Sequence, residues 1–161
     1  MLPDLIEIVP LAKPVPAQIT VPGSKSITNR ALILAALANG ETTLSGALWS
    51  EDTQVMVDCL QELGFMVGVA PDPNEECNRT ITVYGKGGSV PPGGTGQQPV
   101  EVFVGNAGTA ARFLAAFVCL GKGSIACTVS LVCMKGRRPP FSRPFVNWAI
   151  ESIHPMKSCP Q

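Results

Sequence analysis

The sequence has little of the residue types on which metal, redox and triad chemistry depend. Among 161 residues there is one histidine, His154, and the six cysteines are widely spaced with no C-x-x-C pair. A histidine-based metal site or catalytic triad therefore has almost no material. The cysteines are predicted to be reduced, buried thiols of a cytoplasmic protein, and this interpretation is favoured over disulfides or metal ligands. No apolar run is long enough for a membrane span, and the chain start lacks the basic region of a signal peptide.

The chain also has no excess of charge. Its 12 basic and 12 acidic residues cancel, so nothing global favours a nucleic acid or a membrane surface, and we expect neither as a partner. Any anion-binding site must therefore be local. A hydrophobic content of 45% is enough to bury the core of one ordinary domain.

Hydrophobic periodicity predicts strands that alternate with helices. A Gly- and Pro-rich stretch at 86–99 is predicted to be a loop within one domain. The predicted helices are 26–38, 52–64 and 108–121, and the predicted strands are 17–21, 42–48, 65–70, 79–85, 100–104 and 124–132, with a hairpin around "PDPNEECN".

An internal repeat is visible in this order. Arg30 leads "ALILAALANG" and Arg112 leads "FLAAFVCLG", each after a polar turn that contains glycine. The predicted fold class is α/β, made of repeated β-α-β-α-β-β units whose helices are buried on most faces under a sheet. A doubly wound dinucleotide-binding fold is the alternative, but no G-x-G-x-x-G follows a strand. The tail at 137–161 has five prolines and is predicted to be irregular.

Two polar turns precede helices at matching places, "GSKS" before 26–38 and "GNAGTA" at 105–110 before 108–121. The N-terminus of a helix offers free N–H groups and partial positive charge, which suit carboxylate or phosphate. Glycines at 23, 105 and 108 are interpreted as letting the backbone approach a ligand. Lys25 and Arg30 add charge at an end of the helix that is already positive, which indicates an anion there.

Capping alone is the competing interpretation of both turns. It accounts for the serines of the first turn but not for Lys25 beside a positive helix end. Glu51 and Asp52, at the start of the following helix, are interpreted as capping and dipole-matching residues.

"VPGSKSITNRALILAALANG" together with "GNAGTAARFLAA" resembles the 5-enolpyruvylshikimate-3-phosphate synthases (3-phosphoshikimate 1-carboxyvinyltransferases). The resemblance covers roughly residues 5–135, and "LWSEDTQVMVDCLQELG" between the motifs also fits. It implies the enolpyruvyl transferase fold and a transferase of aromatic amino acid biosynthesis. The enolpyruvyl group of phosphoenolpyruvate would pass to the 5-hydroxyl of shikimate 3-phosphate, without metal or organic cofactor.

The resemblance also assigns site residues. Lys25, the catalytic one, would contact both substrates, and Ser26 and Arg30 would hold shikimate 3-phosphate. The positions beside phosphoenolpyruvate would be Asn106, Gly108, Thr109 and Arg138 of "CMKGRRPPF", with Arg137 competing for the last role.

By comparison with that two-domain family the chain is incomplete. Residues 1–22 would belong to the other domain, 23–136 to a partial substrate-binding domain of one and a half units, and 137–161 to an atypical tail. The family's acid and base carboxylates lie in the half that is missing here, so we expect the chain alone to be inactive. The alternatives are a non-catalytic phosphate-ligand half-site, a fragment that needs a partner, one piece of a larger multi-enzyme polypeptide, or a purely structural repeat domain.

Overall fold

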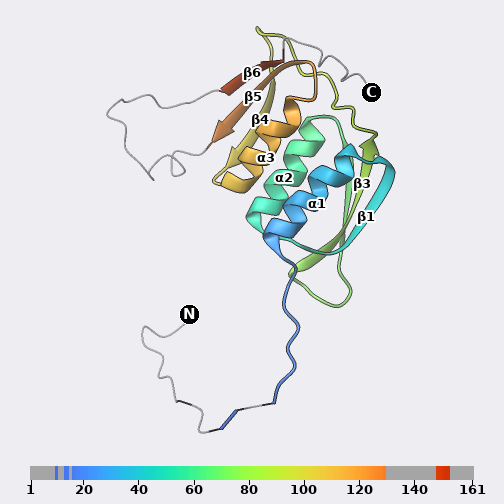
Figure 1. Cartoon of the computed structure of the whole chain (residues 1–161), viewed down its shortest axis with the longest axis vertical. Coiled ribbons are helices and arrows are strands. Elements are labelled where there is room, and N and C mark those ends of the chain that lie inside the picture. Colours follow the sequence, from blue (N-terminus) through green and yellow to red (C-terminus); the bar gives the residue numbers. More distant parts are fainter. Residues whose placement is uncertain (1–9, 11–12, 15, 130–147, 153–161) are drawn as a thin grey trace, which may run out of the picture.

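The computed structural model describes residues 10, 13–14, 16–129 and 148–152. Figure 1 shows the three helices side by side, with β1 and β3 on one side and β4, β5 and β6 on the other. In chain order the elements are α1 (Lys25–Leu37), β1 (Asn39–Leu48), α2 (Glu51–Glu62), β2 (Met66–Pro71), β3 (Asn78–Lys86), β4 (Val100–Gly105), α3 (Gly108–Val118), β5 (Gly123–Val129) and β6 (Trp148–Ser152).

The strands form two separate three-stranded sheets. In the first, β3 lies between β1 and β2 and both pairs are antiparallel, so the predicted hairpin is confirmed. In the second, α3 joins the parallel pair β4 and β5, and β6 adds antiparallel to β5. The α/β class is therefore confirmed. Two sheets with antiparallel pairs, in the part that the structure describes, exclude the doubly wound alternative.

The helix α2 lies within two residues of its predicted bounds, at Glu51–Glu62 instead of 52–64. The backbone N–H of Ser50, its N-cap residue, donates to Thr53 Oγ1 at 2.8 Å. After the last turn, Gly64 has φ of +85°, a left-handed conformation that commonly ends helices and that glycine adopts without strain.

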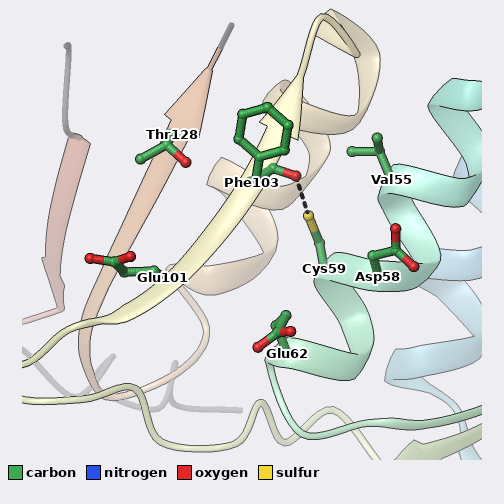
Figure 2. A pocket seen from close by; sticks show the side chains of 7 residues that line it. All are labelled: Val55, Asp58, Cys59, Glu62, Glu101, Phe103 and Thr128. Carbon is green, nitrogen blue, oxygen red and sulfur yellow. Dashed lines mark hydrogen bonds between the residues drawn. The ribbon is translucent and has the colours of Figure 1, made fainter.

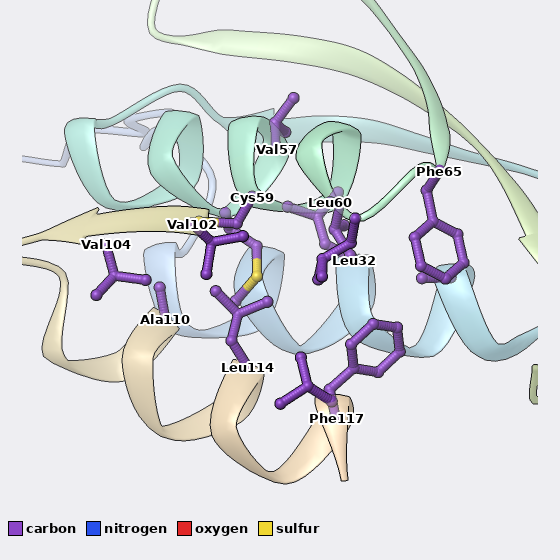
Figure 3. Close-up of a cluster of buried hydrophobic side chains, with 14 of the residues drawn as sticks. Leu32, Val57, Cys59, Leu60, Phe65, Val102, Val104, Ala110, Leu114 and Phe117 are labelled. Carbon is purple, nitrogen blue, oxygen red and sulfur yellow. The ribbon is translucent and has the colours of Figure 1, made fainter. Parts of the chain in front are cut away.

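All three helices run in the same direction, so their N-terminal ends lie at one end of the molecule (Figures 1 and 3). Between them lie fully buried side chains, among them Leu32 of α1, Leu60 of α2 and Leu114 of α3. Because protein interiors are closely packed, this core fixes the position of each helix end relative to the others.

The predicted strand at 17–21 is wrong. These residues form no strand, and Ile19 and Val21 are 79% and 69% exposed. An extended segment becomes a strand only when a neighbour pairs with its N–H and C=O groups. None of the strands in the described ranges pairs with it, and it runs away from the helices in Figure 1.

The composition of α1 predicts a helix that is buried on most faces, and this prediction is wrong. Leu32, Ala35 and Ala36 are buried, but Ile27 and Leu34 are 62% and 67% exposed. Neighbouring elements cover only one side of this helix among the described residues.

The prediction of a wholly irregular tail is also wrong. Residues Trp148–Ser152 form β6, which pairs with the second edge of β5. The prolines that forbid a helix flank this short stretch, and its aromatic and β-branched residues favour a strand where an edge is free. Other residues of the 137–161 tail lie outside the described ranges.

Three further findings concern the described residues. The four described cysteines are free, but only Cys59 and Cys127 are buried, whereas Cys77 and Cys119 are exposed. No helix there is both apolar and long enough to cross a bilayer. The same residues bring no three histidine, cysteine or acidic side chains together as a metal site.

Gly23 is required for packing, not for approach to a ligand as the sequence had suggested. A Cβ at this position would overlap the carbonyl oxygen of Gly46 and come within 2.8 Å of the backbone nitrogen of Leu48. The N–H of Gly23 also donates to Asn78 Oδ1 at 2.8 Å, which ties the start of α1 to β3.

Gly23→Ala is therefore expected to destabilise the chain by about 1–3 kcal/mol, because two backbone groups must move apart. Urea unfolding followed by circular dichroism measures the change. Gly68→Ala is the matched control, since nothing lies within 4 Å of a Cβ built there. Equal midpoints for the two variants would show that this contact does not constrain the fold.

Candidate anion site at the helix N-termini

Lys25 forms an ion pair that joins the first turns of α1 and α2. Its Nζ lies 3.0 Å from Asp52 Oδ2, and the two side chains are 47% and 23% exposed. From the sequence, an anion was the expected partner for Lys25, and Asp52 was interpreted as a capping and dipole-matching residue. Asp52 does lie in the first turn of α2, but it also supplies a negative partner for Lys25 within the chain, which the sequence did not predict.

A chain of hydrogen bonds through Leu48 holds these two first turns together. The N–H of Leu48 donates to Thr28 Oγ1 of α1 at 3.1 Å, and its carbonyl oxygen accepts from Thr53 Oγ1 of α2 at 2.7 Å. Both threonines are buried. The backbones that carry Lys25 and Asp52 are thus fixed relative to each other.

The N-termini of α1 and α3 differ from that of α2. Neither Ser24 nor Ala107, the N-cap residues of α1 and α3, makes a side-chain cap, and neither first turn contains an acidic residue. The first turn of α2 holds Glu51 and Asp52. Capping by the N-cap side chain, the competing interpretation of the two polar turns, is therefore wrong for both. Their first-turn N–H groups keep the partial positive charge that attracts anions.

The other two residues predicted for a site at the start of α1 lie on the exposed side of the helix. Ser26 and Arg30 are exposed, and Arg30 folds back so that its Nε donates to the carbonyl oxygen of Ser26 at 3.0 Å. The guanidinium group keeps further donors that could engage a phosphate.

The "GNAGTA" turn lies at the end of β4, at the same end of the molecule as the start of α1 (Figure 1). Gly105 has φ of +51°, and Asn106 is exposed. No atom lies within 4 Å of a Cβ built on Gly108, so the backbone there is open to approach. Thr109 is half-buried. The fold thus brings both predicted turns to one end, while Arg138 and Arg137 lie outside the described residues.

Asn29 is a buried residue of the polar stretch at 21–30 to which the sequence assigned no role. It is fully buried, and neither its Oδ1 nor its Nδ2 has a hydrogen-bond partner among the described residues. It lies one turn before Leu32, on the face of α1 that packs into the core. Buried amides without partners are rare in native proteins. Within the polar run Thr28-Asn29-Arg30, the sequence alone does not distinguish Asn29 as the buried residue.

Two hollows on the described part of the surface differ in their suitability for an anion. One of about 320 Å³ lies beside the start of α1 and includes Ser24, Ile27 and Thr28. A larger one of about 440 Å³, between α2 and β4, has Asp58, Glu62 and Glu101 around it (Figure 2). Three carboxylates repel phosphate, so the larger hollow is not the anion site that the sequence predicts.

Cys59 is the thiol of that larger hollow. Its Sγ donates to the carbonyl oxygen of Phe103 at 3.5 Å, on the edge of β4 that faces α2 (Figure 2). Burial, with smaller contributions from Cys127 and nearby carboxylates, raises the pKa of Cys59 to about 12. It is therefore a structural thiol and not a nucleophile at neutral pH.

Comparison with known proteins agrees with this architecture. Repeated α/β units with parallel helices between two sheets define the class of enolpyruvyl transferase folds. The family model of EPSP synthase (3-phosphoshikimate 1-carboxyvinyltransferase) matches residues 10–144. The chain therefore belongs to the EPSP synthase family.

Individual relatives match over a limited part of their length. A 3-phosphoshikimate 1-carboxyvinyltransferase from Nostoc sp. is 47% identical over 120 residues, covering 74% of this chain and 26% of the relative. One from Opitutus terrae is 50% identical over 115 residues, covering 71% and 25%. The structure of an EPSP synthase from Acinetobacter baumannii superposes with a TM-score of 0.59 at 24% identity, over 74% of this chain and 24% of that one. The chain thus spans about a quarter of the length of these relatives.

Proposed function

We propose that the chain is a segment of a 3-phosphoshikimate 1-carboxyvinyltransferase that contributes part of its substrate site. In the complete enzyme the enolpyruvyl group of phosphoenolpyruvate would pass to the 5-hydroxyl of shikimate 3-phosphate, releasing phosphate, in aromatic amino acid biosynthesis. The observation that carries the proposal is the pair of open, non-acidic helix N-termini at one end of the molecule. Each substrate carries a phosphate group, and phosphate suits such ends.

The proposed roles are those that the resemblance to the family implies, and the position of the residues at the helix ends supports them. Lys25, Ser26 and Arg30 at the start of α1 would hold shikimate 3-phosphate, with Lys25 also reaching phosphoenolpyruvate as the catalytic residue. The open turn at the start of α3 would hold phosphoenolpyruvate through Asn106, Gly108 and Thr109. Arg138 remains proposed from its motif alone. No metal or organic cofactor is part of the proposal.

We propose that the isolated chain binds without turning over. The reaction needs a proton delivered to the methylene carbon of phosphoenolpyruvate and a proton removed from the 5-hydroxyl. At the described helix ends the nearest carboxylate to Lys25 is Asp52, which is already ion-paired.

The exposed stretch at 16–22 supports a second element of the proposal, that residues 1–22 belong with another domain and 23–136 form a partial substrate-binding domain. A cytoplasmic location is proposed with it.

Phosphate release and ligand binding, measured together, test this function. The 161-residue chain is expected to release no phosphate from the two substrates, yet to show a thermal shift with shikimate 3-phosphate. A full-length relative such as the Nostoc enzyme provides the positive control. Turnover comparable to that enzyme would contradict the inactive-segment proposal, and the absence of any thermal shift would favour a purely structural repeat domain.

One alternative, a non-catalytic half-site or partner-dependent fragment, rests on the same open helix ends. It differs in what restores activity. Adding the remaining part of a relative as a separate chain should produce turnover if this chain is a partner-dependent fragment, and none if it is only a binding half-site.

A further inference from the structure

We propose that Asp52 is an internal counter-ion that occupies Lys25 in the free protein and weakens the binding of simple anions to the site. This inference rests on the proposed function, because it takes Lys25 as a ligand for a substrate anion. The 3.0 Å contact between Lys25 Nζ and Asp52 Oδ2 is the observation that carries it.

The backbone that carries Asp52 is held in place independently of the ion pair. Asp52 lies in the first turn of α2, where negative charge is favoured by the helix dipole. The adjacent Thr53 is fully buried and bonded to the carbonyl oxygen of Leu48. An anion that reaches Lys25 therefore meets a negative charge on a fixed backbone.

The Asp52 carboxylate has two opposing effects on anion affinity: it orients Lys25, and it repels the anion. Their relative sizes decide whether the affinity rises or falls. Orienting a half-exposed lysine contributes little, since exposed ion pairs have small net effects. Repulsion between unit charges at contact distance changes affinity about fivefold in water, and more for a dianion or at lower effective dielectric. Repulsion is thus the larger effect for an anion that makes one contact only.

Asp52 lowers the affinity of any anion at Lys25, but a ligand with several contacts has other interactions that offset the repulsion. The exposed Ser26 and Arg30 and the open end of α3 supply such contacts. Inorganic phosphate cannot use all of them, whereas a phosphorylated carboxylic acid can. The repulsion therefore leaves single-contact anions bound too weakly to occupy Lys25, whereas a ligand with several contacts still binds.

The test is Asp52→Asn in the 161-residue chain, with inorganic phosphate as the probe and amide chemical shifts at the starts of α1 and α3 as the readout. Phosphate affinity is expected to rise about fivefold at low salt, and the gain should shrink as salt screens it. Asp58→Asn is the matched control, because it removes an equal charge from an exposed position further along α2. Asp52→Glu keeps the charge and should show no gain.

Combining Lys25→Ala with Asp52→Asn should abolish the gain in phosphate affinity. This result would identify Lys25 as the group on which the gain depends. Unchanged or weaker phosphate binding in Asp52→Asn, or a gain no larger than that of Asp58→Asn, would overturn the proposal. Urea unfolding checks that each variant remains folded. Failure of the proposed function is distinguishable: the unaltered chain would then bind neither substrate, while a Lys25-dependent gain for phosphate in Asp52→Asn would still identify the counter-ion.

Discussion

Lys25→Ala is expected to weaken binding of shikimate 3-phosphate to this chain by about 10- to 150-fold, which corresponds to the 1.5–3 kcal/mol of one charge-assisted hydrogen bond. The effect should lie toward the upper end, because the substitution also leaves the Asp52 carboxylate without its cation beside the arriving phosphate. Isothermal titration calorimetry at low and moderate salt measures the loss. Stability should change little, since Lys25 is exposed and its ion pair is worth about 1 kcal/mol at most.

Lys122→Ala is the control for this experiment. Lys122 is also exposed, but it precedes β5, beyond the C-terminal end of α3, and so lies away from the open helix ends. Its replacement removes an equal charge and should leave affinity almost unchanged. If both variants bind shikimate 3-phosphate as the unaltered chain does, Lys25 is a solvated surface residue and the anion site is elsewhere.

The parts of the fold that depend on local sequence could be predicted. The cap of α2, the glycine after it and the periodic apolar residues indicate where the three helices and the first five strands lie, because each signal acts within a few residues. The two polar turns were found for the same reason. Each one directly precedes a helix, and the lack of a side-chain cap agrees with the prediction that they are more than capped ends.

The errors all concern partners that are distant along the chain. Residues 17–21 have the composition of a strand but no neighbour that pairs with them, and Trp148–Ser152 finds one in β5. The position of Asp52 at the start of a helix already explained the residue locally, without a distant partner. Its pairing with Lys25 depends on α1 and α2 lying parallel with adjacent first turns, which no local pattern specifies.

The exposed side of α1 is another case in which distant contacts decide. Leu32 and Leu34 have the same side chain and are two positions apart, yet one is fully buried and the other is 67% exposed. Residues two positions apart on a helix do not face the same direction. Composition alone predicted both to be buried, and only the packing of the neighbouring strands and helices against one face of α1 distinguishes them.

Leu32→Ala is accordingly expected to destabilise the chain by about 2–5 kcal/mol, the range for removing a buried leucine side chain and leaving a cavity. Figure 3 shows Leu32 in the same buried cluster as Leu60 of α2 and Leu114 of α3. A small domain has a total stability of about 5–15 kcal/mol, so this loss is a large fraction of what holds the helices together. Urea unfolding followed by circular dichroism measures it.

Leu34→Ala makes the same chemical change on the same helix at an exposed position, and it should shift stability by less than about 0.5 kcal/mol. Similar losses in the two variants would mean that the exposed side of α1 is covered in solution, contrary to the arrangement described. A large loss for Leu32 alone would have a functional consequence as well. Because Leu32 packs α1 against the neighbouring helices, loosening it should also weaken binding of shikimate 3-phosphate in any fraction that stays folded, since the open ends of α1 and α3 would no longer be held at a fixed separation.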